Sequence, residues 1–445
     1  MLIADRSPGV SLARFSARRA RVLDQLGSSA LVLSAGPLRF KNADSEYRFR
    51  PTSDFLYLSG WGEPDAVLVL RAHADEDRFV LFVPPRLPEA ELWTGARLGC
   101  DGARELLRAD AAYPISELSE RLPQLLDGAE HLYARLGSEE GLDRLLLQTL
   151  TSARSRAQRH GGRPVGVLDP GAVLDDMRLI KDAEELERIR HACAITVEGF
   201  RAGVAAVRAG AGEWEVQAAL EGAFLRQRAQ GPAFGTIVGG GPRACVLHYT
   251  ANDQPLPDQG WVLIDAGAEA AAYAGDVTRT LPVAGRPHPL AGELYAAVLN
   301  AKRAGFDTIR PGATIDDVES AVRTRLEEAL TALGVVPAGD EEVRRARFKA
   351  LIPHKASHWL GLDVHDVGAY RVHGASRTFE PGMVLTVEPG IYIPADDERA
   401  PSELRGLGIR IEDDALVTAQ GVENLTAALP DDLESVLALR DGVGG

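Results

Sequence analysis

The chain has 445 residues, of which 45% are hydrophobic and 25% are charged, a balance typical of soluble globular proteins. Its formal net charge of −15 argues against nucleic acid or an anionic membrane as a main partner. The length predicts two or three domains, since it exceeds what one hydrophobic core accommodates. We expect a cytoplasmic protein, because the sequence shows no signal peptide, no apolar run of transmembrane length and only scattered cysteines.

Residues 1–172 are predicted to form an N-terminal α/β domain. Helical periodicity covers residues 11–27 and recurs around residues 115–126 and 141–154. Apolar runs predict strands of a mixed sheet at residues 30–34, 54–60, 66–71 and 78–83. The segment 159–171 is rich in Gly and Pro, as domain boundaries often are, so the second domain is assigned to residues 173–445.

The second domain contains an internal repeat. It opens with a predicted helix, because Asp182 and Glu185 have the spacing of a capping box. Residues 201–216 then match residues 303–318 without gaps, and both copies predict a helix, a turn at Gly and a second helix. The repeat indicates two related halves, and a site between them would draw residues from both.

Acidic residues end several apolar strands of this domain. One apolar run ends on Asp265, with Asp276 following shortly, and another ends on Glu388 before Pro-Gly. In a third run, alternation places Arg410 and Glu412 on one face of a strand. Four buried carboxylates require cations close to them. Two divalent metal ions would balance the charge, with a hydroxide as a natural bridge between them.

Histidines are concentrated just before these last strands. His354, His358, His365 and His373 fall within twenty residues of a chain that has ten histidines, so one of them is expected to be a ligand. Oxygen-rich ligation with a single imidazole favours Mn²⁺, Co²⁺ or Fe²⁺ over Zn²⁺. Further upstream, the glycines of residues 238–244 lack phosphate-loop spacing and predict a turn before a strand that carries His248.

Several of these segments resemble the five-ligand signature of the pita-bread metallopeptidases. They are IDAGAEAAAYAGDVTRT, SHWLGLDVHDVG, VLTVEPG and GIRIEDD. The segments LHYT and ENLT, together with NADSEYRFRPTSDFLYLSGWGEPDAVLVL and AELWTGARLG in the first domain, are most similar to the aminopeptidase P branch. The resemblance implies an α/β N-terminal domain and an α+β pita-bread catalytic domain with an internally duplicated, curved antiparallel sheet.

The resemblance also implies a ligand set for two divalent metal ions. Asp265 would chelate the first ion, and Asp276 and Glu412 would bridge both. His358 and Glu388 would complete the coordination of the second. The expected metal is Mn²⁺, with Co²⁺, Fe²⁺ and Zn²⁺ as alternatives.

Further residues would act on the substrate. His248 and His365 would hold the substrate carbonyl and the charge that develops on it, while Glu388 would carry a proton to the leaving nitrogen. Arg410 would orient the carboxylates, and His354 is a further catalytic candidate. Trp93 would either reach a proline pocket from a neighbouring subunit or be a buried aromatic of its own domain.

The implied activity is hydrolysis, by a metal-bridging hydroxide, of the bond between an N-terminal residue and a following proline. Prolidase shares all five ligands and is the nearest alternative. The extra N-terminal domain disfavours methionine aminopeptidase, and the intact ligand set disfavours creatinase-like enzymes and non-catalytic proteins of this fold. We expect peptide substrates with proline in second position, no nucleic-acid or membrane partner, and a homodimer or homotetramer. Lys355 and Ala356, between His354 and His358, depart from the family pattern, which leaves fine substrate preference and rate open but not metal ligation.

Overall fold

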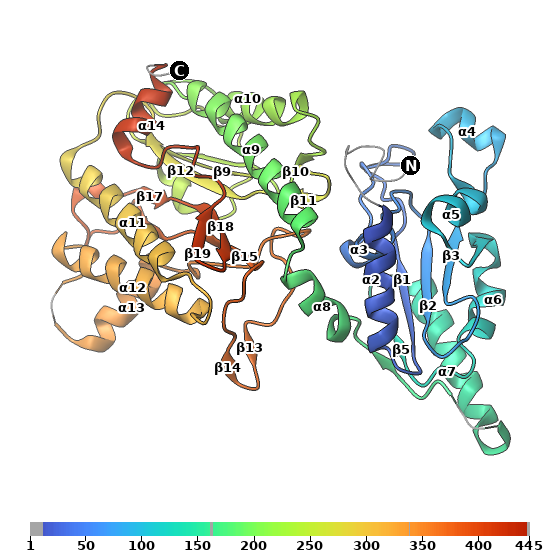
Figure 1. Ribbon diagram of the computed structural model, residues 1–445. Coiled ribbons are helices and arrows are strands. Elements are labelled where there is room, and N and C mark those ends of the chain that lie inside the picture. Colours follow the sequence, from blue (N-terminus) through green and yellow to red (C-terminus); the bar gives the residue numbers. More distant parts are fainter. Residues whose placement is uncertain (1–11, 161–162, 338, 443–445) are drawn as a thin grey trace. The chain divides into compact units, whose positions relative to one another are not determined.

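The computed structural model describes residues 12–160, 163–337 and 339–442 (Figure 1). The chain separates into two compact units, Met1–Met177 and Arg178–Gly445. The predicted absence of a signal peptide concerns residues outside the described ranges, and so does part of the boundary segment 159–171. Among the described helices, none is long and apolar enough to cross a membrane.

The first unit is built on a six-stranded mixed sheet, as predicted. Its strands lie in the order β4-β3-β2-β1-β5-β6, with antiparallel pairing of β1 with β2 and of β2 with β3 and parallel pairing elsewhere. The strands are β1 (Ala30–Ser34), β2 (Val67–Arg71), β3 (Phe79–Val83), β4 (Ala111–Pro114), β5 (Leu132–Tyr133) and β6 (Val167–Leu168). The helices are α2 (Leu12–Gln25), α3 (Ser53–Ser59), α4 (Pro88–Thr94), α5 (Gly99–Leu107), α6 (Leu118–Leu125) and α7 (Glu140–His160), and α8 (Gly171–Leu179) leads into the second unit.

One predicted strand of this unit is wrong. Residues 54–60 contribute to helix α3 and not to the sheet. Every residue of α3 is buried, so its side chains show no periodicity that would distinguish a helix from a strand. The available signal was Gly60, which ends the helix in the left-handed conformation (φ 66°) and donates its N–H to the Leu56 carbonyl.

The first half of the second unit packs two helices against antiparallel strands. Helix α9 (Ala183–Ala205) begins at the predicted capping box, where Asp182 Oδ1 accepts from the Glu185 N–H at 2.9 Å. Helix α10 (Glu213–Arg226) packs against α9. Strands β8 (Ile237–Gly240), β9 (Trp261–Ala266) and β12 (Val277–Pro282) form one sheet. Strands β7 (Gly231–Pro232), β10 (Ala268–Ala270) and β11 (Tyr273–Ala274) form another.

The second half repeats this plan. Helices α11 (Pro289–Thr308) and α12 (Ile315–Ala332) pack together, followed by α13 (Glu341–Leu351). Strands β15 (Val384–Val387), β18 (Asp413–Thr418) and β19 (Gly421–Asn424) form a sheet, and β16 (Gly390–Ile393) pairs with β17 (Leu407–Arg410). A hairpin of β13 (Arg371–Val372) and β14 (Ala375–Ser376) and the last helix α14 (Leu433–Arg440) complete the unit. The predicted fold class, an α/β domain followed by a two-part α+β domain, is confirmed.

The sequence repeat occupies the same helix–turn–helix joint in both halves. At equivalent positions, Glu215 accepts from the Gly212 N–H at 2.7 Å and Asp317 accepts from the Thr314 N–H at 2.8 Å. The two halves meet where Thr278 of β12 pairs with Glu412 in an isolated antiparallel bridge. Strand ends from both halves, with their acidic residues, therefore lie side by side.

Candidate metal centre

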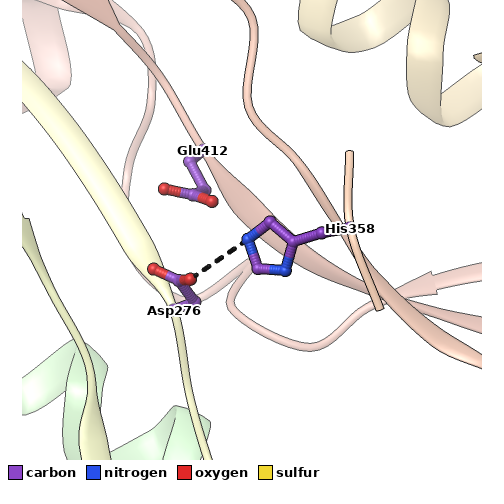
Figure 2. Close-up of side chains that lie close together, drawn as sticks. All are labelled: Asp276, His358 and Glu412. Atoms are coloured by element: carbon purple, nitrogen blue, oxygen red, sulfur yellow. Dashed lines mark ion pairs between the residues drawn. The ribbon is translucent and has the colours of Figure 1, made fainter. Parts of the chain in front are cut away.

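Three of the predicted ligands point toward one another (Figure 2). Asp276, His358 and Glu412 each offer one ligand atom, and these atoms all lie within 4.8 Å of one another. Asp276 directly precedes β12 in the first half, whereas His358 and Glu412 belong to the second half. Asp276 is 4% exposed and Glu412 is 2% exposed. The site is therefore a buried junction of the two halves.

Glu388 and Asp265 extend this group. Glu388 directly follows β15, and its Oε1 lies 3.6 Å from His358 Nε2, which is also 3.5 Å from Asp276 Oδ2. Asp265 lies in β9 opposite Thr278 of the neighbouring strand, and its charge acts on Asp276. The structure thus brings together all five residues predicted to bind metal.

The positive charge near these carboxylates does not balance their negative charge. Burial, together with the nearby charges of Asp265, Asp414 and Glu388, raises the pKa of Asp276 well above its usual value. Burial and the same kind of repulsion raise the pKa of Glu412 well above its usual value. Burial also raises the pKa of Glu388 to about 7, although His358 and Arg410 act in the opposite direction. Cations placed among these groups would restore the usual ionised state.

Two carboxylate oxygens are suited to bind such cations. Oδ1 of Asp265 and Oδ1 of Asp276 are buried and have no hydrogen-bond partner within the described ranges. Buried polar atoms are usually hydrogen-bonded, so these two oxygens are available as ligands. A donor set of four carboxylates and one imidazole suits hard or borderline divalent cations. The residues present therefore fit a pair of divalent metal ions.

Arg410 organises the ligands from one side. Its guanidinium, on a side chain that is 5% exposed, donates Nη2–H to Asp265 and Nε–H to Thr278 Oγ1 at 3.0 Å. Thr278 Oγ1 in turn donates to Glu412 Oε2 at 2.6 Å. The prediction that Arg410 and Glu412 share one strand is wrong. Strand β17 ends at Arg410, and Glu412 pairs with Thr278 across the junction of the two halves.

His354 belongs to the same hydrogen-bond network. Its Nδ1 lies 2.7 Å from the Lys355 carbonyl, so Nδ1 carries the proton and Nε2 accepts from the Tyr392 hydroxyl at 2.8 Å. Tyr392 Oη accepts from Arg410 Nη1 at 2.7 Å. Burial, with the charge of Arg410, lowers the pKa of His354 to about 4, so this imidazole is neutral at neutral pH. His354 Nδ1 also lies 3.5 Å from Glu388 Oε2.

The two other predicted catalytic histidines lie beside the ligands and are exposed. The ring of His365 packs against the ring of His358 with centroids 4.3 Å apart. Burial, then the charges of His358 and His248, lower the pKa of His365. The prediction of a strand carrying His248 is wrong, since β8 ends at Gly240 and His248 lies in a turn. Both imidazoles are accessible to a ligand.

The comparisons with known proteins agree with this arrangement. Residues 187–419 match the model of metallopeptidase family M24, and residues 15–133 match the N-terminal domain of aminopeptidase P. The chain belongs to metallopeptidase family M24. Among its M24 relatives, the Xaa-Pro aminopeptidase of Escherichia coli is 40% identical over 435 residues, which cover 96% of this chain and 98% of the relative. Mouse Xaa-Pro aminopeptidase 3 is 34% identical, with coverage of 97% and 86%.

Solved M24 structures are also similar. Aminopeptidase PepP of Pseudomonas aeruginosa superposes with a TM-score of 0.93 at 39% identity, covering 97% of this chain and 98% of that chain. A variant of Escherichia coli aminopeptidase P in complex with substrate gives a TM-score of 0.92 at 39% identity, with coverage of 97% and 99%. The likeness extends over both units of this chain.

The remaining predicted residues lie at exposed positions. His373 is exposed in the turn between β13 and β14. Trp93 in α4 is 86% exposed, so the alternative of a buried aromatic is wrong for this residue. The Lys355 side chain is 77% exposed, and its Nζ lies 3.6 Å from Glu319 Oε1. The positive charge of Lys355 is therefore presented to solvent next to His354.

Some residues that support the site were not predicted. Asp366 follows His365, has a side chain that is 1% exposed, and accepts from Arg178 Nη2 and from Lys181 Nζ at 3.0 Å. Behind the bridge of the two halves, Arg279 Nη1 donates to the backbone carbonyls of Glu412 at 2.6 Å and Thr278 at 2.9 Å. Apart from Thr278, which directly precedes Arg279, these partners lie more than a hundred residues away in sequence, so local patterns carry little signal for Asp366 and Arg279.

Gly361 leaves room for the Asp366 carboxylate. A Cβ at position 361 would overlap Asp366 Oδ2 and lie 3.0 Å from Lys181 Cε. We expect Gly361→Ala to displace the buried charge and lower the free energy of unfolding by about 3 kcal/mol. Denaturant unfolding measures this, with Gly292→Ala as control, because a Cβ there meets only Leu433 Cδ2 at 4.0 Å. Equal stability of the two variants would contradict the expected clash.

Removal of metal with a chelator is expected to make the free energy of unfolding strongly pH-dependent. A carboxyl group whose pKa is raised by folding stabilises the fold below its unfolded pKa, and this contribution is lost as pH rises through the folded pKa. For Glu388 the loss falls between about pH 4.5 and about 7, and Asp276 and Glu412, whose pKa values burial also raises well above the usual range, contribute in the same direction.

Metal binding acts in the opposite direction, because it requires deprotonated ligands. The Tm difference between Mn²⁺-loaded and chelated protein should therefore increase from pH 5 to pH 8, reaching at least about 5 °C. Differential scanning calorimetry at constant ionic strength measures this difference. A difference that is absent or constant across this range would argue against a metal site made of these groups.

Proposed function

We propose that this M24 family member is an Xaa-Pro aminopeptidase, which hydrolyses the bond between an N-terminal residue and a following proline. The observation that carries the proposal is the convergence of four carboxylates and one imidazole from both halves of the second unit, beside two exposed histidines. Relatives and solved structures that carry this name and match nearly the whole chain support it.

The metal ions would be held by the residues already described. Asp265 would chelate one ion, Asp276 and Glu412 would bridge two, and His358 and Glu388 would complete the second position. Divalent ions bound there would supply Lewis acidity and lower the pKa of an attacking water. We propose Mn²⁺ as the metal because the donor set is rich in oxygen.

The residues of the chain would handle the proton and the developing charge. The peptide nitrogen of proline leaves as an amine and must receive a proton, which Glu388 would carry from the attacking water. His248 and His365 would donate hydrogen bonds to the substrate carbonyl oxygen, where negative charge increases in the transition state. Arg410 would keep Asp265 in place directly and Glu412 through Thr278.

The proposal also covers the setting of the reaction. We assign residues 1–172 to the N-terminal domain and residues 173–445 to the catalytic domain. We propose a cytoplasmic homodimer or homotetramer that takes peptides with proline in second position and binds neither nucleic acid nor membranes. Trp93, which lies on α4 next to the 82% exposed Leu92, would contact the neighbouring subunit at the proline pocket.

Hydrolysis of an Xaa-Pro-Yaa tripeptide and of the matching Xaa-Pro dipeptide tests this function. The protein would be stripped with chelator and reconstituted with Mn²⁺, Co²⁺, Fe²⁺ or Zn²⁺ in parallel. We expect release of the first residue from the tripeptide, with kcat/KM reduced about 10³-fold in Glu388→Ala. Glu341→Ala is the control, because that side chain is 87% exposed. Cleavage of the dipeptide alone would identify a prolidase, and inactivity with every metal would contradict a catalytic role.

A further inference from the structure

The connection between β8 and β9, which carries His248, is held at both ends by one buried carboxylate. That carboxylate is Glu213, the first residue of α10, which is 0% exposed. Its Oε1 accepts from the Gly240 N–H at 2.8 Å, where β8 ends. Its Oε2 accepts from the Gln254 N–H at 3.2 Å, shortly before β9. One side chain thus closes the loop at its base.

Glu213 also binds two side chains that flank His248. Oε1 accepts from Arg243 Nε at 2.7 Å, and Oε2 accepts from the Tyr249 hydroxyl at 2.9 Å. Arg243 Nη2 in turn donates to the Pro255 carbonyl at 3.0 Å. Both carboxylate oxygens are therefore fully used in holding the loop. Hydrogen bonds to an ionised carboxylate are among the stronger ones in proteins, which makes this loop rigid.

The base of the loop is buried and tightly hydrogen-bonded, whereas His248, farther along the loop, is exposed. Asn252, which is 2% exposed, supports the base further by accepting from the Val238 N–H at 2.9 Å and donating to the Thr236 carbonyl at 2.8 Å. His248 is exposed, and its charge acts on both His365 and His354. The loop therefore presents one imidazole to the metal centre from a fixed frame.

The internal repeat indicates that Glu213 is not needed to build the helix joint itself. The equivalent position in the second half is Ile315, the first residue of α12, and that joint forms with Asp317 bonded to the Thr314 N–H. The acid that the two joints share is Glu215, which corresponds to Asp317. Glu213 therefore distinguishes the half that carries the His248 loop from the other half, which has Ile315 at the equivalent position.

We propose that Glu213 is a positioning residue for His248, fixing the loop so that the imidazole meets the substrate carbonyl. This inference rests on the proposed function, in which His248 stabilises the charge on that carbonyl. A carboxamide at position 213 keeps the shape but places an NH₂ group against two donors, so the loop must shift. Displacement of a catalytic group by about 1 Å can lower the rate about 10²-fold.

A double-mutant cycle with Glu213→Gln and His248→Ala tests this inference. Steady-state kinetics on an Xaa-Pro-Yaa tripeptide with Mn²⁺-loaded protein should show kcat reduced about 10-fold to 100-fold in Glu213→Gln, with KM changed less than about threefold. In the His248→Ala background the same change should cost less than about twofold. Mn²⁺ affinity, measured by calorimetry, should not change. Glu215→Gln, on the same helix turn, is the matched control and should stay within about twofold of wild type.

Each outcome decides the inference. Equal losses from Glu213→Gln with and without His248, or a loss no larger than that in Glu215→Gln, would overturn it while leaving the proposed function intact. If Glu213→Gln does not fold, Tyr249→Phe replaces it, with an expected loss of about threefold that disappears without His248. A loss that persists without His248 would overturn the inference. An inactive wild-type protein would overturn the proposed function and this inference with it.

Discussion

Replacing Asp276 with Asn is expected to lower kcat/KM for an Xaa-Pro-Yaa tripeptide by at least about 10³-fold. Asp276 lies in the first half at the junction with the second, and its Oδ2 is 3.5 Å from His358 Nε2. Its Oδ1 is buried and has no hydrogen-bond partner in the described ranges. A carboxamide offers one weak neutral ligand atom where the proposed bridge needs two charged ones. Calorimetric titration with Mn²⁺ should show reduced metal binding together with the loss of activity.

The same substitution is expected to stabilise the chelated protein. At pH 8 the carboxylates of the metal-free cluster lower the free energy of unfolding, because burial and neighbouring negative charges disfavour ionised Asp276 and raise its pKa. Asn removes that effect, so the Tm of chelated Asp276→Asn should exceed that of chelated wild type by about 3 °C or more. Asp316→Asn makes the same change in net charge at a half-exposed surface position and should shift Tm by less than about 1 °C. A lower Tm for chelated Asp276→Asn would contradict the charge argument.

Replacing Arg410 with Met is expected to have the opposite effect on stability. Arg410 is the buried cation that contacts Asp265, and Met leaves that carboxylate without its partner. The free energy of unfolding of the chelated protein should fall by about 3 kcal/mol. The activity should fall about 10²-fold, because Asp265 and Glu412 both lose their support. Arg410→Lys keeps the charge without the planar fork and should be intermediate in both measurements.

A second buried ion pair allows the effect of Arg410 on ligand orientation to be separated from its effect on the stability of the fold. Arg347 and Asp397 form an ion pair in which both side chains are nearly buried. Arg347→Met should therefore lower the free energy of unfolding by a similar amount, about 3 kcal/mol, while kcat/KM stays within about twofold of wild type. Denaturant unfolding and steady-state kinetics on the three variants provide the comparison. Equal losses of activity in Arg347→Met and Arg410→Met would show that instability, and not ligand orientation, causes the effect.

Three acids of the candidate site could be found in the sequence because each leaves a local trace, whereas the resemblance to pita-bread metallopeptidases supplied their proposed roles as ligands. Asp265, Glu388 and Glu412 stand at or near the end of apolar strands, where a buried charge is unexpected. Arg410 was also anticipated, but two other residues that support these acids, Thr278 and Tyr392, leave no such trace. Thr278 donates to Glu412 across 134 positions of sequence. Tyr392 looks like any other strand residue in the sequence, and only the pairing of β16 with β17 places it beside Arg410.

Local patterns also failed where burial is uniform or where the chain turns. Every residue of α3 is buried, so its apolar run resembled a strand. The segment that carries His248 was expected to form a strand after a turn, but His248 lies in a turn, and the side chains of Arg243 and Tyr249 bind Glu213, which lies before this segment in sequence. In both cases the deciding partner is distant along the chain. Pattern analysis therefore predicts elements and their charged ends better than the contacts that fix them.

The bridge between Thr278 and Glu412 has a consequence for how the two halves can change over time. Neither half alone carries all five proposed ligands, since Asp265 and Asp276 belong to one and His358, Glu388 and Glu412 to the other. The two halves share the repeated helix–turn–helix joint but hold different proposed ligands, so a substitution that shifts one half along the Thr278–Glu412 bridge displaces its ligands relative to those of the other. Selection on the proposed catalysis would therefore act on the relative position of the two halves, so that the sequence of one half constrains which substitutions the other can accept.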